Sequence, residues 1–168
     1  MLCDPPITID QTTETLVLSH LDYCSIIWSS ANQRDLGKLQ LAQNRAARLA
    51  LQCPSRSNVD VMHGKLSWMK VKDRLTVSLL VFLRNIRESK YPTCLYTQLR
   101  LSSDTHEYNT RHATRGCYQL PKAKKESMQR TVLYRAMVAW NALPEKIIKD
   151  KTKPGFKKQL KSHLAAQK

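Results

Sequence analysis

The residues of this sequence best suited to binding chemistry are lysines and arginines clustered in its C-terminal half. They form four successive groups: Lys122, Lys124 and Lys125; Arg130 and Arg135; Lys146, Lys149, Lys151 and Lys153; Lys157, Lys158 and Lys161. Clusters of this kind can neutralise backbone phosphates without distinguishing the bases. Four aromatic residues lie nearby: Tyr108, Tyr118, Tyr134 and Trp140. Such side chains stack on unpaired bases, although the helical spacing of the last two is more typical of a hydrophobic core.

A zinc site is the second chemistry that residue types suggest. Four soft ligands fall within 24 residues, namely Cys94, His106, His112 and Cys117. The closely spaced cysteine pair that fixes the geometry of a zinc knuckle is missing, and the spacing matches no common pattern. Two surface histidines and two buried thiols are therefore the favoured interpretation.

The residue patterns that usually perform catalysis are also missing from the sequence. Gly37-Lys38-Leu39 lacks the hydroxyl residue and the preceding glycine of a phosphate-binding loop, and there is no serine nucleophile elbow. The acidic residues are scattered, and the pair Asp104 and Glu107 lies in a polar stretch where solvated carboxylates are expected. We therefore predict no catalytic residue, no metal site and no cofactor.

The composition favours a helical protein with a buried core and no membrane span. A chain of 168 residues that is 42% hydrophobic can form one compact domain or two small ones. The longest apolar runs are too short to cross a bilayer. Only 4 residues are glycine, and this shortage disfavours a sandwich or barrel of many strands.

Positive charge is concentrated in the second half of the chain. The sequence holds 28 basic and 13 acidic side chains, a net charge of +15, which indicates an acidic partner. Residues 1–84 hold 10 basic and 7 acidic side chains, whereas residues 85–168 hold 18 and 6. A lysine-rich surface that serves only solubility is the alternative.

Five widely spaced cysteines and no signal segment predict a reduced intracellular protein, nuclear or cytoplasmic.

The first third of the chain has the pattern of a helical hairpin. Apolar residues at helical spacing predict one helix over residues 13–31 and a second over 36–53. The first apolar stripe consists of Val17, Leu21, Cys24, Trp28 and Ala31, and the second of Leu36, Leu39, Ala42, Ala46, Leu49 and Cys53. The polar break between them is so short that we expect antiparallel packing. Cys24 and Cys53 lie on the apolar stripes and are expected to be small core residues.

The remaining pattern predicts further helices and one irregular connection. The helices are expected at residues 58–66 and 71–88, in a short turn after Pro92, and near 127–143 and 154–165. Periodicity disappears between residues 100 and 125, where we expect irregular structure with a short strand near 117–120. The predicted fold is mainly α: a helical hairpin or bundle over residues 1–91, then a basic C-terminal region over 92–168 with an irregular segment and terminal helices.

Five short motifs occur in order along the chain. They are Leu21-Asp22-Tyr23-Cys24; Leu39-Gln40 with Gln43-Asn44-Arg45-Ala46-Ala47-Arg48; Leu66-Ser67-Trp68 with Val71 and Arg74; Asn109-Thr110-Arg111; and Trp140-Asn141-Ala142-Leu143-Pro144 with Phe156-Lys157 and Leu160-Lys161. This succession, from about residue 14 to 165, resembles the C-terminal end of reverse transcriptases from non-LTR retrotransposons of the jockey and chicken-repeat kind. These enzymes are RNA-directed DNA polymerases encoded by transposable elements.

The resemblance implies a thumb-like helical region over residues 1–91, followed by the basic region beyond it. In that family the magnesium-binding aspartates belong to an upstream palm, so this chain is expected to be a non-catalytic fragment that contacts the palm in a full-length element. A thumb grips the primer–template duplex, so the expected partner is RNA, DNA or RNA–DNA hybrid, held through its backbone. The expected phosphate contacts are Arg45, Arg48, Arg74, Arg111, Arg115, Lys122, Lys124 and Lys125.

A helical protein-interaction module with no nucleic-acid role is the alternative function. In that case the apolar stripes bind a protein, and an uncovered face of the hairpin over residues 13–53 predicts self-association. For Arg45 and Arg48, the alternative to phosphate contact is that they are ordinary solvent-facing charges on the second helix. Arg111 and Arg115 lie in a segment without periodicity, which favours a functional role for them.

Overall fold

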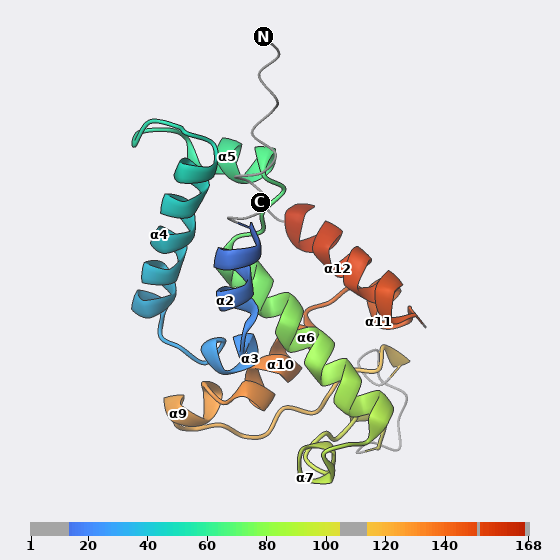
Figure 1. Ribbon diagram of the computed structural model, residues 1–168. Helices are drawn as coiled ribbons and strands as arrows, with labels where there is room; N and C mark the ends of the chain where they lie inside the picture. Colours follow the sequence, from blue (N-terminus) through green and yellow to red (C-terminus); the bar gives the residue numbers. More distant parts are fainter. Residues whose placement is uncertain (1–13, 105–113, 151, 167–168) are drawn as a thin grey trace. The chain divides into compact units, whose positions relative to one another are not determined.

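The computed structural model of the protein describes residues 14–104, 114–150 and 152–166 (Figure 1). Most of these residues are helical, which confirms the predicted mainly α fold. The β pairing in this part of the chain is one isolated antiparallel bridge between Leu101 and Tyr118, so the strand predicted near residues 117–120 is wrong. The chain forms two compact units that divide between Leu75 and Thr76, here called unit 1 and unit 2.

The long helix α6 (Val71–Ser89) spans this division. Its bounds agree with the helix predicted over residues 71–88, because its apolar positions follow the helical period closely. Val71 and Leu75 belong to a hydrophobic cluster of unit 1. Leu80 and Leu83, both fully buried, belong to unit 2. The sequence pattern predicted the boundary between the two regions of the chain after residue 91, later than the boundary between the two compact units.

Unit 1 begins with three short helical elements where one long helix was predicted. They are the π-helical turn η1 (Glu14–Leu18), α2 (Ser19–Asp22) and α3 (Ser25–Trp28). The chain breaks after α2 because Tyr23 is extended and Cys24 adopts a left-handed conformation with φ of 50°. The prediction of one helix over residues 13–31 is therefore wrong.

The break also changes which side chains of this segment are buried. Ser25 and Ser29 are buried, and Ser29 satisfies its hydroxyl by donating to the carbonyl of Ile26 at 2.5 Å. Cys24 and Trp28, which the helical pattern placed in the core, are exposed. Cys53 is half-buried beside a core cluster, so its predicted place is partly confirmed, whereas that of Cys24 is wrong.

The helix α4 (Gln33–Ala50) follows and returns alongside α2 and α3, as expected of a helical hairpin (Figure 1). Asn32 caps its first turn, because the Asn32 side chain accepts a hydrogen bond from the Asp35 amide at 2.8 Å. Leu21 and Leu39 pack against the same buried cluster, which joins the two arms of the hairpin.

The buried face of α4 differs from the predicted apolar stripe and includes polar residues. Gln43 is fully buried and its amide donates to the carbonyl of Met69 at 2.9 Å. The Gln40 side chain accepts from the Val71 amide at 2.9 Å, so two glutamines hold the turn before α6. Leu49, expected inside, is 71% exposed. These hydrogen bonds offset the free-energy cost of removing the two side-chain amides from water, so this face of α4 can be buried.

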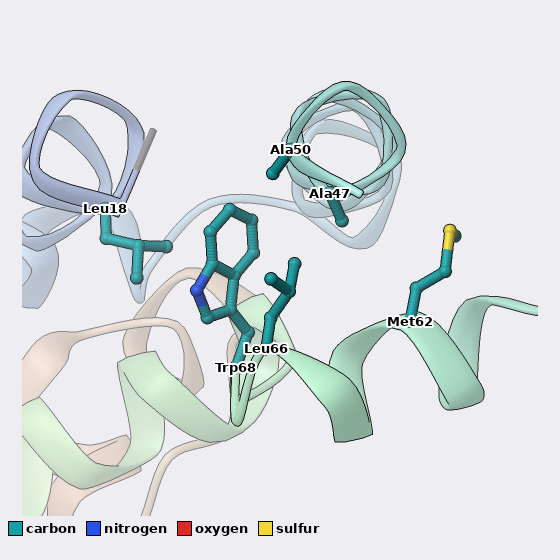
Figure 2. Close-up of a cluster of buried hydrophobic side chains, with 6 residues drawn as sticks. All are labelled: Leu18, Ala47, Ala50, Met62, Leu66 and Trp68. Carbon is teal, nitrogen blue, oxygen red and sulfur yellow. The ribbon is translucent and has the colours of Figure 1, made fainter. Parts of the chain in front are cut away.

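A second cluster of unit 1 surrounds Trp68. The short helix α5 (Val59–Lys65) agrees with the prediction over residues 58–66, and Asn58 caps it by accepting from the Asp60 amide at 2.9 Å. Figure 2 shows the Trp68 ring between Leu18 and the alanines of α4. The core members are Leu18, Ala47, Ala50, Met62, Leu66 and Trp68. Small alanines on α4 leave room for the indole ring.

Unit 2 contains the rest of α6 and a series of shorter elements. These are α7 (Thr93–Tyr96), η2 (Ser102–Asp104), α9 (Glu126–Gln129), α10 (Val132–Asn141), α11 (Glu145–Ile148) and α12 (Lys153–Ala166). The helix predicted over residues 127–143 is two helices, because Thr131 is extended with ψ of 143°. Helix α12 agrees with the prediction over 154–165.

Three aromatic rings and two arginines form the centre of unit 2. The ring centres of Tyr118 and Trp140 are 5.8 Å apart, and those of Trp140 and Phe156 are also 5.8 Å apart. From α6, the Arg84 guanidinium carbon lies 4.7 Å from the Phe156 ring centre. That of Arg87 lies 6.0 and 5.8 Å from the ring centres of Tyr118 and Trp140. These cation–π contacts join segments that are distant in sequence.

The polar network of α4 can be tested by the substitution Gln43→Leu. Leucine fits the volume but leaves the Met69 carbonyl without its hydrogen bond inside unit 1. We expect the free energy of unfolding to fall by about 1–3 kcal/mol, measured as a lower midpoint of urea unfolding. Gln33→Ala at an exposed position of the same helix should change it by less than about 0.5 kcal/mol. Equal midpoints for the two variants would contradict the role given to Gln43.

Candidate nucleic-acid interface

The basic side chains divide into those that the fold uses and those that stay exposed. Arg84 belongs to the first class and is only 6% exposed. Its Nε donates to Glu88 Oε1 at 2.6 Å, and Nη1 donates to the Thr152 carbonyl at 3.3 Å. The hydrogen bond from Arg84 is the main cause of the lowered pKa of Glu88, and Lys153 at 3.4 Å adds to it. Arg84 is thus bound within the protein.

Among the arginines predicted to contact phosphates, Arg74 is part of the fold of unit 1. Its Nη1 donates to Asp22 Oδ2 at 2.6 Å, and its side chain is 19% exposed. This ion pair joins the first turn of α6 to α2, so the charge of Arg74 is already balanced. Arg48 is half-buried, and its Nε lies buried without a hydrogen-bond partner in the described part of the chain. Arg45 is exposed on α4.

Arg115 also has a structural partner. Its Nη2 donates to the carbonyl of Leu143 at 2.7 Å, which satisfies a carbonyl just beyond the end of α10. Next to it, the Asn141 side chain exchanges two 2.8 Å hydrogen bonds with the backbone of Tyr118. The hydrogen bond fixes the Arg115 side chain against the end of α10, and its predicted contact with a phosphate stays a prediction.

Lys122, Lys124 and Lys125, which the sequence also predicted as phosphate contacts, lie at the surface. All three are exposed in the irregular segment that leads into α9. No salt bridge joins any of them to an acidic residue that the structure describes. The nearest basic neighbour along the chain behaves differently, because Arg130 pairs with Glu126 at 2.6 Å.

Helix α12 presents a second group of exposed lysines, Lys157, Lys158 and Lys161. The opposite side of the helix is anchored by Phe156 and Leu160, which are buried. These lysines were visible as a cluster in the sequence but were left out of the predicted contact residues. The amphipathic spacing of α12 was the signal that could have added them, since it places the lysines away from the buried stripe.

The two units differ strongly in charge. Unit 2, residues 76–168, holds 19 basic and 6 acidic side chains, a net charge of +13. Unit 1 holds the other 9 basic and 7 acidic side chains, a net charge of +2. The charge asymmetry predicted from the sequence therefore follows the division into compact units. Unit 2 therefore carries nearly all of the positive excess of the chain.

Of the four candidate zinc ligands, the structure describes the two cysteines. His106, His112 and Arg111 lie outside the described residues. Cys94 is exposed and Cys117 is buried, and both are free thiols. Among the residues that the structure describes, there is no group of three histidine, cysteine, aspartate or glutamate side chains arranged to hold a metal ion.

Two carboxyl groups near the basic residues have a pKa below the ordinary value because they accept hydrogen bonds within the protein. The hydrogen bond from Lys149 is the main cause of the lowered pKa of Glu145. The hydrogen bond from the backbone amide of Thr152 is the main cause of the lowered pKa of Asp150. A carboxyl group that works as a general acid at neutral pH needs a raised pKa instead. Burial raises the pKa of Tyr118, which packs in the aromatic centre.

Comparisons of the chain with protein-family models, with curated proteins and with solved structures give no significant match. The resemblance to reverse transcriptases therefore stays a prediction from the motifs alone. Within the described ranges, no helix is both long and apolar enough to cross a membrane.

The division of the cations into structural and exposed classes can be tested by two substitutions. Arg115→Met removes a charged hydrogen bond to the Leu143 carbonyl, and we expect the free energy of unfolding to fall by about 1.5–3 kcal/mol. Lys124→Met, at an exposed position, should change it by less than about 0.5 kcal/mol. Both values come from urea unfolding followed by circular dichroism. A stable Arg115→Met variant would return Arg115 to the candidate phosphate contacts.

Proposed function

We propose that this protein is a non-catalytic nucleic-acid-binding piece of a retrotransposon-type reverse transcriptase. It binds the backbone of RNA, DNA or an RNA–DNA hybrid inside the cell, and in a longer polypeptide it adjoins a polymerase palm. The observation that supports this most is the net charge of +13 in unit 2, together with exposed lysines that form no salt bridge with the acidic residues that the structure describes. The order of the five sequence motifs supports the reverse-transcriptase part of the proposal.

The binding surface that we propose has two parts. The first consists of Lys122, Lys124 and Lys125, and the second of Lys157, Lys158 and Lys161 on α12. Lysine ammonium groups act as mobile point charges that neutralise phosphates without a fixed geometry, so binding is largely independent of sequence. Arg74 and Arg115 are excluded from this surface because their partners lie within the protein.

Salt dependence tests the proposal directly. For contact with about five phosphates, log affinity for a duplex should fall with log salt at a slope of roughly −4. The triple variant Lys122→Gln, Lys124→Gln, Lys125→Gln should make this slope about 2–3 units shallower, measured by fluorescence anisotropy. The matched control is Arg34→Gln, Arg56→Gln, Lys65→Gln, which removes three exposed charges from unit 1. Absence of binding at low salt, or equal loss in both triple variants, would contradict the proposed surface.

A protein-interaction module is the second candidate function, and unit 1 has an observation that favours it. Large apolar side chains are exposed on its first helices, with Leu16 at 59%, Ile27 at 67% and Trp28 at 48% exposed. Leu16 and Trp28 also line an apolar groove of about 520 Å³ together with Leu39 and Val71. Exposed apolar patches of this kind are typical of protein–protein contacts.

Under this second function the isolated protein self-associates through unit 1. We expect sedimentation at increasing concentration to show a mass above the monomer, and Leu16→Ser with Ile27→Ser to restore the monomer. Leu49→Ser is the control, because Leu49 is exposed on α4 and does not line the groove. A wild-type protein that stays monomeric at all concentrations would leave nucleic-acid binding as the better function.

A further inference from the structure

Unit 2 contains a groove of about 740 Å³, within the size range of ligand-binding sites. Its walls come from the segment around α7, from residues 119–123, and from α9 and α10. Most of the lining is apolar and includes Leu120, Val132 and Met137. The half-buried ring of Tyr134 forms part of the same wall. An apolar groove with an aromatic side chain suits a flat, weakly polar ligand.

The charged residues of the groove identify the class of ligand. Arg100 and Lys122 line it, both exposed, and its lining includes no acidic residue from the described part of the chain. Lys124 and Lys125 continue the same segment beyond the groove. A ligand that fits must combine apolar planar parts with regularly placed negative charge. A single strand of nucleic acid has this combination, because each unpaired base has an apolar face and each nucleotide brings one phosphate.

We propose that this groove holds unpaired bases of a single strand whose phosphates lie on Arg100 and Lys122, an inference that rests on the proposed backbone binding. The groove then gives the protein a preference for single-stranded segments or overhangs over duplex. Bases in a duplex are stacked on their neighbours and cannot enter the groove without unpairing. An acidic amphipathic protein helix is the competing occupant, and the experiment below includes it.

The decisive probe is a strand without bases. Labelled oligothymidylate of about 12 nucleotides is compared with an abasic strand of equal length and charge, by fluorescence anisotropy. Stacking of even one base in the groove should make the wild-type protein bind oligothymidylate about tenfold more tightly than the abasic strand. Ala123→Phe fills the groove without changing charge and should reduce this ratio to about 1. Ala142→Phe, exposed in unit 2 and outside the groove, should keep it.

A measurement on the wild-type protein covers the case in which Ala123→Phe fails to fold. Met128 and Met137 line the groove, whereas Met62 lies in the core of unit 1. In methyl NMR spectra, oligothymidylate should shift the signals of Met128 and Met137 and leave that of Met62 in place. The abasic strand should shift none of the three.

The outcomes separate this inference from the function on which it rests. Equal affinity for both strands, or unmoved groove methionines, would overturn the base-binding groove while backbone binding stands. No binding of either strand at low salt would remove the proposed function itself. If an acidic amphipathic peptide shifts the methyl signals of Met128 and Met137 and neither strand does, the groove belongs to a protein partner and the inference fails.

Discussion

The contact of two α6 arginines with three aromatic rings is the interaction on which unit 2 depends. The rings of Tyr118, Trp140 and Phe156 come from segments distant in sequence, and Arg84 and Arg87 lie against them. A buried guanidinium is costly unless its charge is compensated, and here ring faces, Glu88 and a carbonyl provide the compensation. The planar, weakly hydrated guanidinium suits this role better than an ammonium group does.

The two arginines at the centre of unit 2 therefore differ in role from the lysines of the proposed binding clusters. The exposed cations in the two proposed binding clusters of unit 2 are lysines, whereas Arg84 and Arg115 are bound to partners of their own. Strongly hydrated ammonium groups on flexible stems fit transient contact with phosphates along a strand. The two proposals place backbone affinity and base stacking in one unit: the lysine clusters would supply the first and the apolar groove beside Lys122 the second.

Sequence patterns predicted individual helices with unequal success. The bounds of α5, α6 and α12 were predicted closely. Their signals are apolar spacing, a capping residue or a proline near the helix start, and each depends only on residues close in sequence. The helix expected over residues 13–31 failed at Cys24, whose left-handed backbone has no local signal in a cysteine. The buried face of α4 was also missed, because Gln43 is stabilised inside by a carbonyl 26 residues away.

The sequence by itself determined the helical content, the positions of the strongly periodic helices, and the concentration of positive charge that follows unit 2. Tertiary structure decided which of the described cations have partners within the fold. Nothing local distinguishes Arg74 or Arg115 from an exposed lysine, because the partners Asp22 and Leu143 lie 52 and 28 residues away. Helix formation depends on neighbours within a few residues, whereas the pairing of a charge depends on which distant segments the fold brings beside it.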